Sequence, residues 1–113
     1  MWRLRPKRAS GDALALALDG RLAPSADVMF VRRSAFTVLL DVNHGQYYSL
    51  NETAITVWSA LTDEVPFEDT LARMTREYDV SRVTLERDVT DLLKDLLAAD
   101  LLIVRDGTVV NAT

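Results

Sequence analysis

The sequence predicts an α+β fold in which a three-stranded antiparallel sheet precedes three helices. Two observations carry this prediction: a hairpin pattern from Val38 to Leu50, and three amphipathic segments with capping residues after it. Asn43, His44 and Gly45 interrupt the hairpin where a tight turn needs positive φ angles. The chain has 113 residues, of which 49% are hydrophobic and 27% charged, so it has room for one globular core.

Three short segments are expected to form the sheet. Val28 to Arg33 and Ala35 to Val42 are rich in apolar and β-branched residues, and Gln46 to Leu50 follows the turn. Side chains alternate along a strand, so Tyr48 and Leu50 share one face of the sheet. Tyr47 and Ser49 then lie on the other face.

Three helices are expected after the sheet. Asn51 and Ser81 are suitable N-caps for the first and third, and Pro66 is tolerated at the first position of the second. On the third helix four residues fall within an arc of about 60°, the expected core face: Leu85, Val89, Leu92 and Leu96. Five others form a shoulder beside that arc: Arg82, Glu86, Thr90, Leu93 and Leu97. The two leucines of this shoulder fit either a thicker core or the wall of a groove.

The two ends of the chain differ from its middle. Residues 1–27 are expected to be a basic N-terminal extension, partly ordered at most, outside a domain that spans residues 28–113. Residues 1–33 carry seven Lys or Arg and three Asp, whereas residues 34–113 carry six basic and fourteen acidic residues, so the domain is acidic. Asp106 and Gly107 separate Leu101–Val104 from Thr108–Val110, a pattern that predicts a small C-terminal hairpin.

The composition excludes several kinds of chemistry. The chain has no cysteine, and the lone His44 cannot complete a zinc site. No glycine-rich loop has nucleotide-binding spacing, and the carboxylates of the third helix are spread around it, so neither a cofactor nor an enzymatic activity is expected. No apolar run approaches the roughly 18 residues of a membrane span, and no signal peptide is evident, so we expect a cytoplasmic protein without a membrane partner.

The second helix, the tight turn, the third helix and the possible hairpin together outline a winged helix-turn-helix. The usual function of this arrangement is DNA binding, which needs basic or amide side chains on the third helix. Between Arg82 and Ala99 there are three basic and four acidic residues. DNA phosphates would repel such a helix, so nucleic acid is not an expected partner. A DNA-binding regulator is therefore only the alternative reading.

Several motifs that follow one another in a characteristic order support a different functional interpretation. They are G-x-Y-Y-x-L-N at Gly45–Asn51, the Ile55 and Trp58 stripe, Tyr78-Asp79, and D-V-x-x-L-L-x-x-L at Asp88–Leu96. Over residues 28–104 the chain resembles the PqqD-like family, small domains that bind leader peptides of ribosomally made, later modified peptides. The hairpin is more similar to the discrete recognition proteins of lasso-peptide systems than to PqqD itself. Asp63-Glu64 and Asp100 stand where the family often has glycine, and aspartate adopts a left-handed cap less readily than glycine.

The resemblance implies a function and a site. In this family the leader peptide adds as a further strand to the third strand, above a groove beside the third helix. The expected peptide-binding residues are, on the strand, Gln46, Tyr47, Tyr48, Ser49 and Leu50, and, on the helix, Arg82, Glu86, Thr90, Leu93 and Leu97. The expected partners are a precursor leader peptide and a separate maturation enzyme, such as a leader peptidase or a cyclase.

Overall fold

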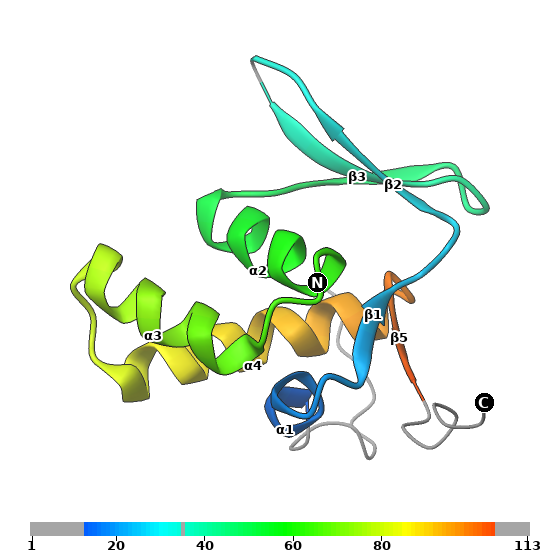
Figure 1. Ribbon diagram of the computed structural model, residues 1–113. Coiled ribbons are helices and arrows are strands. Elements are labelled where there is room, and N and C mark those ends of the chain that lie inside the picture. Colours follow the sequence, from blue (N-terminus) through cyan, green and yellow to red (C-terminus); the bar gives the residue numbers. More distant parts are fainter. Residues whose placement is uncertain (1–12, 35, 106–113) are drawn as a thin grey trace.

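The computed structural model describes residues 13–34 and 36–105. A three-stranded sheet lies over a group of helices, and a two-stranded sheet lies beside the same helices (Figure 1). In chain order the elements are α1 (Ala13–Leu18), β1 (Leu22–Pro24), β2 (Val28–Arg32), β3 (Thr37–Asp41), β4 (Gln46–Ser49), α2 (Glu52–Thr62), α3 (Phe67–Tyr78), α4 (Arg82–Ala98) and β5 (Leu102–Val104). The expected sheet of three strands followed by three helices is confirmed.

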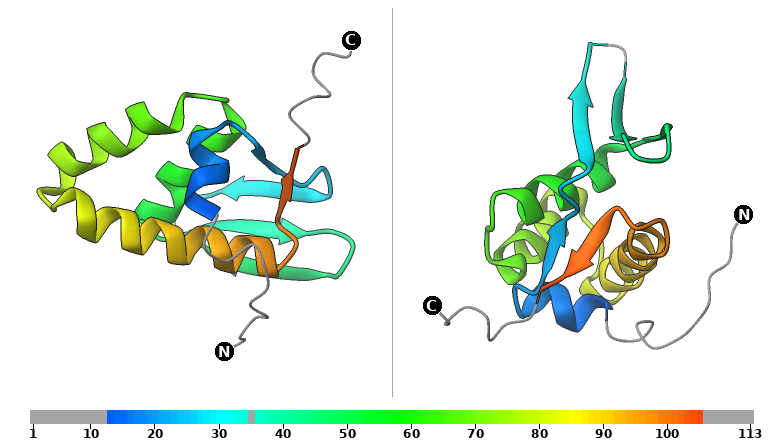
Figure 2. Two further views of the ribbon diagram at one scale, coloured as in Figure 1. Left: turned by 90° about the horizontal axis from the view of Figure 1, so that it is seen from below. Right: turned by 90° about the vertical axis from the view of Figure 1, so that its right-hand side faces the viewer.

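The larger sheet has the order β2-β3-β4, and all its pairs are antiparallel. The β2–β3 hairpin projects away from the helices at its turn (Figure 2, right). Gly45 has a φ of 65° in the turn between β3 and β4, as the sequence predicts. Within the described residues β4 has a neighbour on one side only, so it is an edge of this sheet.

Local capping explains where the helices begin. The Asn51 side chain accepts a hydrogen bond of 2.9 Å from the Ala54 N–H, and the Ser81 side chain accepts one of 3.1 Å from the Thr84 N–H. Pro66 takes the N-cap position of α3 instead of its first helical position. In the described part of the chain, no helix is both long and apolar enough to cross a membrane.

The helices and the smaller sheet enclose one apolar core. Fully buried side chains come from every layer of the fold and include Ala13, Leu39, Val57, Leu71, Met74, Val89, Leu93 and Leu101. Because α1 contributes to this core, the structure departs from the expectation that the domain begins at residue 28. The basic residues before Ala13 lie outside the described residues.

The expected C-terminal hairpin is only partly described. Its first strand is present as β5, but this strand pairs with β1 in the register Leu22↔Val104 and Pro24↔Leu102. The expected turn and second strand, residues 106–110, lie outside the described residues. The pairing of β1 with β5 brings opposite ends of the described chain together, and Leu22 and Leu102 from these strands are buried in the core.

Three helices end in the same strained conformation. Glu64, Asp79 and Asp100, which follow α2, α3 and α4, have φ angles of 57°, 53° and 62°. After α4 the Leu101 N–H donates to the Leu96 carbonyl at 2.9 Å, the hydrogen bond of a helix end that normally uses glycine. Glu64 and Asp100 stand where the family often has glycine, and both adopt the left-handed conformation that glycine adopts most readily.

Replacing Asp100 with glycine is expected to stabilise the protein. The change removes the steric cost of a side chain at positive φ and should raise the free energy of unfolding by about 0.5–1 kcal/mol. Arg87→Gly is the matched control, because Arg87 is exposed inside α4, where glycine should lower the free energy of unfolding by about 0.7–1 kcal/mol. Urea denaturation measures both. Equal destabilisation by the two glycines would contradict the left-handed geometry at Asp100.

Candidate functional site

The backbone of β4 presents unpaired hydrogen-bonding groups at the open edge of the sheet. The Leu50 N–H donates to the Thr37 carbonyl at 2.9 Å. Hydrogen-bonded positions alternate along an antiparallel ladder, so the backbone of Tyr48 and Gln46 also faces β3. The N–H and C=O groups of Tyr47 and Ser49 therefore point away from the sheet. They can accept a further strand.

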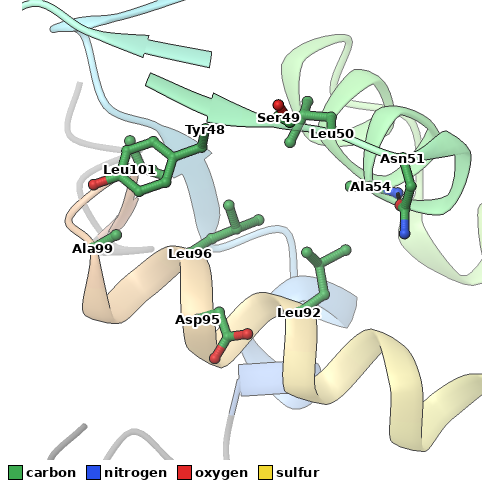
Figure 3. A pocket seen from close by; sticks show the side chains of 10 residues that line it. All are labelled: Tyr48, Ser49, Leu50, Asn51, Ala54, Leu92, Asp95, Leu96, Ala99 and Leu101. Atoms are coloured by element: carbon green, nitrogen blue, oxygen red, sulfur yellow. Dashed lines mark hydrogen bonds between the residues drawn. The ribbon is translucent and has the colours of Figure 1, made fainter. Parts of the chain in front are cut away.

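An apolar groove of about 520 Å³ lies between this edge and α4. Figure 3 shows Tyr48 and Leu50 directed from β4 toward α4, while Leu92 and Leu96 project from α4 toward the strand. The lining is mostly apolar, with one charged side chain, and consists of Tyr48, Ser49, Leu50, Asn51, Ala54, Leu92, Asp95, Leu96, Ala99 and Leu101. This size and lining are typical of a site that takes side chains of a ligand.

The structure corrects the face of α4 that was assigned to the groove. Leu93, expected in the groove wall, has 0% of its surface exposed and belongs to the core. Leu92, expected in the core, is half-buried and lines the groove. Both α1 and α3 pack against α4, and Leu93 lies on the side of α4 that is buried in the core. The prediction of the buried face of this helix took no account of α1, because residues 1–27 were expected to lie outside the domain.

The other four residues of the shoulder are not brought to the groove either. Arg82 donates to both carboxylate oxygens of Glu68 on α3, at 3.0 and 2.6 Å, and to Glu86 at 2.7 Å. This ion-pair network ties the start of α4 to the start of α3. Thr90 and Leu97 are half-buried on the same side of α4 and do not line the groove.

More of the predicted strand residues than of the predicted helix residues lie in the groove. Tyr48, Ser49 and Leu50 line the groove, whereas Gln46 and Tyr47 lie on the same edge outside it. The Gln46 side chain accepts a hydrogen bond of 3.0 Å from the Tyr48 hydroxyl, which helps to orient that ring. Sequence reasoning missed seven lining residues: Leu92 and Leu96, which it assigned to the core, and Asn51, Ala54, Asp95, Ala99 and Leu101. The helical spacing of Leu92, Leu96 and Ala99 identifies their common face once the packing side of α4 is known.

Side-chain hydrogen bonds stabilise the turn that precedes β4. The His44 ring nitrogen Nδ1 lies 2.9 Å from the buried Asp41 carboxylate, and the His44 backbone N–H donates to the same carboxylate at 3.2 Å. Burial raises the pKa of Asp41, but the hydrogen bonds from His44 outweigh it, so the net pKa lies below the ordinary value. Asn43 adds a hydrogen bond of 2.7 Å to Asp27, at the start of the neighbouring strand. The position of the edge strand is therefore well defined.

The Arg82–Glu68 pair predicts a specific pH dependence of stability. Hydrogen bonding to Arg82 holds the pKa of Glu68 below its ordinary value of 4.5. A lowered folded-state pKa stabilises the fold above the unfolded-state pKa, and that contribution disappears as the pH falls through the folded-state value. Glu68→Gln should therefore lower the melting temperature at neutral pH, and the gap to the unaltered protein should close in acid.

Thermal unfolding of the two proteins across the acid range measures this gap. Glu77→Gln is the control, because its partner Arg73 lies at a longer distance of 3.6 Å and both side chains are about half exposed. A gap between Glu68→Gln and the unaltered protein that is independent of pH would contradict the ion pair.

A free sheet edge above an apolar groove defines a class of binding modules that can take an extended peptide as an added strand. A family model, coenzyme PQQ synthesis protein D (PqqD), matches residues 37–102, more than half of the chain. The chain belongs to this family. The match spans β3, β4, α2, α3 and α4, and so includes the strand and the two helices, β4, α2 and α4, that line the groove.

Two solved structures are similar to this chain. One is TbiB1 in complex with the TbiA(beta) leader peptide, with 31% sequence identity, a TM-score of 0.65, and 71% of this chain and 93% of that chain covered. The other is lasso peptide synthetase B1 complexed with the leader peptide, with 28% identity, a TM-score of 0.68, and 74% and 98% covered. A comparison with curated proteins finds no match.

Proposed function

We propose that this protein is a non-catalytic binder of the leader segment of a ribosomally made precursor peptide. The leader adds as a strand to β4 and places alternate side chains in the groove beside α4. The protein then delivers the precursor to a separate processing enzyme. Because such precursors are made by ribosomes in the cytoplasm, the proposal places the protein there.

One observation carries the proposal: the outward backbone groups of Tyr47 and Ser49 lie directly beside the apolar groove. An unpaired strand edge invites aggregation, and proteins usually cover or charge such edges. A peptide strand would pair these groups and bury the groove in one step, with main-chain hydrogen bonds for affinity and side-chain pockets for register. Both similar solved structures were determined with leader peptides, and one of them is a lasso peptide synthetase B1, which supports the lasso-peptide type.

The site residues follow from this geometry. The backbone edge runs from Gln46 to Leu50, and the groove floor consists of Tyr48, Leu50, Leu92 and Leu96. Of the helix residues expected from the sequence, Leu93 is replaced by Leu92. Arg82 and Glu86 are engaged with α3, and we assign them no contact with the peptide.

A second apolar surface supports the delivery step. Met29, Leu40 and Tyr47 form one row across the three strands on the face opposite the groove. Met29 and Tyr47 are 54% and 70% exposed, and Phe36 on the same face is 52% exposed. Exposed apolar surface of this kind marks interaction sites. It offers the processing enzyme a place that a peptide bound in the groove does not occupy.

The alternative of a DNA-binding regulator has little physical support. The would-be recognition helix α4 has Asp88, Asp91 and Asp95 on its exposed side. Carboxylates there oppose the approach of phosphates. The similar structures, both leader-peptide complexes, give this alternative no support.

Fluorescence anisotropy tests the proposal. The probe is a labelled synthetic peptide with the N-terminal half of the product of a short open reading frame adjacent to this gene. Its C-terminal half serves as the control. We expect saturable binding of the N-terminal half only, with the peptide recovered at unchanged mass. Failure to bind that half, together with salt-sensitive binding of a DNA duplex, would favour the DNA-binding alternative.

A further inference from the structure

Asp95 is the one charged side chain in the lining of the groove. In Figure 3 it leaves α4 between Leu92 and Leu96, and its carboxylate points away from β4, at the outer edge of the groove. The residue is exposed, and among the residues that the structure describes no Lys, Arg or His lies within salt-bridge distance of its carboxylate. A groove that is otherwise uncharged thus carries one negative charge with no partner in the described chain.

The position of Asp95 is unfavourable for the helix that carries it. Asp95 lies in the last turn of α4, and that turn has no basic residue. The carboxyl end of a helix carries a partial negative charge, and an acidic side chain there is destabilising because the two negative charges repel. A residue that breaks a local rule of this kind is expected at a functional position. The helix dipole also adds to the negative potential at this end of the groove.

Two further aspartates extend the charge along the same rim. At 100° per residue, Asp88 and Asp91 fall within about 60° of Asp95 on α4, and all three are exposed. Arg82, at the start of the helix, is engaged with Glu68 and Glu86. The potential along the rim therefore favours a cationic ligand.

An added strand can bring a cation to this carboxylate. A leader residue opposite Tyr48 shares the face of Tyr48, so its side chain enters the groove. A Lys or Arg there can lay its aliphatic stem on Leu92 and Leu96 and extend its charged end to the rim. An arginine can also donate two parallel hydrogen bonds to a carboxylate.

We propose that Asp95 selects leader peptides with a Lys or Arg at a position that faces the groove. This inference rests on the proposed function and specifies its ligand: an extended segment with apolar and basic side chains at alternate positions. Asp95 is the specificity-determining residue. The groove leucines and the edge of β4 supply the remaining contacts.

A charge-reversal experiment tests the selection. The probe is the labelled N-terminal half of the neighbouring precursor, together with variants in which each Lys or Arg is changed to Glu, one at a time. Asp95→Asn should weaken binding of the unaltered peptide about three- to tenfold, and Asp95→Lys should weaken it further. One Glu variant of the peptide should bind Asp95→Lys more tightly than it binds the unaltered protein.

The control is Asp91→Asn, because Asp91 lies on the same rim but does not line the groove. Its affinity should stay within about twofold of the unaltered protein. Asp91→Asn should keep the melting temperature, and Asp95→Asn should keep or slightly raise it, because it removes a negative charge from the carboxyl end of α4. Equal affinities of Asp95→Asn and the unaltered protein, or no peptide variant that rescues Asp95→Lys, would overturn the inference and leave the proposed function standing. No binding by the unaltered protein would overturn both.

Discussion

Leu93→Asp is expected to remove a large part of the free energy of unfolding. Leu93 has 0% exposed surface in the core beneath α4, and a carboxylate there would have no water to solvate it. Burying an unpaired charge costs several kcal/mol, so we expect a loss of at least about 4 kcal/mol from the free energy of unfolding. A domain of this size is stable by only about 5–15 kcal/mol.

The neighbouring leucine should behave in the opposite way. Leu92 is half-buried in the groove, so Leu92→Asp should cost only about 1–2 kcal/mol of stability but weaken peptide binding at least about tenfold. Leu93→Met is the control for substitution at this position, because methionine conserves the side-chain volume. It should lower the free energy of unfolding by less than about 1.5 kcal/mol and leave the affinity for the peptide unchanged. Urea denaturation and peptide anisotropy measure the three variants. If Leu93→Asp stays folded and loses binding while Leu92→Asp binds normally, the groove lies on the other side of α4.

Ser49→Pro is expected to weaken leader binding at least about tenfold while the fold persists. The Ser49 N–H points away from β3, so its loss removes no hydrogen bond of the sheet, and proline is tolerated on such edges. The ring also occupies the space through which an added strand would approach. Ser49→Ala is the control, since it keeps the N–H and removes only the hydroxyl.

Circular dichroism and anisotropy separate the outcomes for Ser49. A folded Ser49→Pro variant with the affinity of Ser49→Ala would show that the peptide does not pair with this N–H. A Tyr48→Pro variant provides a further contrast. The Tyr48 N–H faces β3, so that substitution should destabilise the sheet itself.

Features set by neighbouring residues could be predicted from the sequence. The turn at Gly45 and the caps Asn51 and Ser81 depend on side chains and backbone within a few residues of one another. The alternation of Tyr48 and Leu50 with Tyr47 and Ser49 follows from strand geometry alone. These signals sufficed for the order of strands and helices and for the strand half of the site.

Features set by distant parts of the chain could not be predicted. The pairing of Leu22 with Val104 joins two segments whose own sequences carry no mutual signal. The rotation of α4 about its axis depends on α1, which covers one side of it and turns Leu93 inward. A helical wheel ranks apolar arcs but does not show which arc a neighbouring helix will cover. For this reason the sequence-based prediction assigned the groove to the shoulder of α4 that carries Leu93 instead of the adjacent face that carries Leu92 and Leu96.

The most direct test of strand addition at β4 is amide hydrogen exchange measured by NMR, with and without the leader peptide. We expect the amides of Tyr47 and Ser49 to exchange quickly in the free protein and to become protected in the complex, since each would donate to the peptide backbone. The Tyr48 and Leu50 amides, already paired with β3, should be protected in both states. A peptide that binds while the amides of Tyr47 and Ser49 exchange as in the free protein would contradict the account.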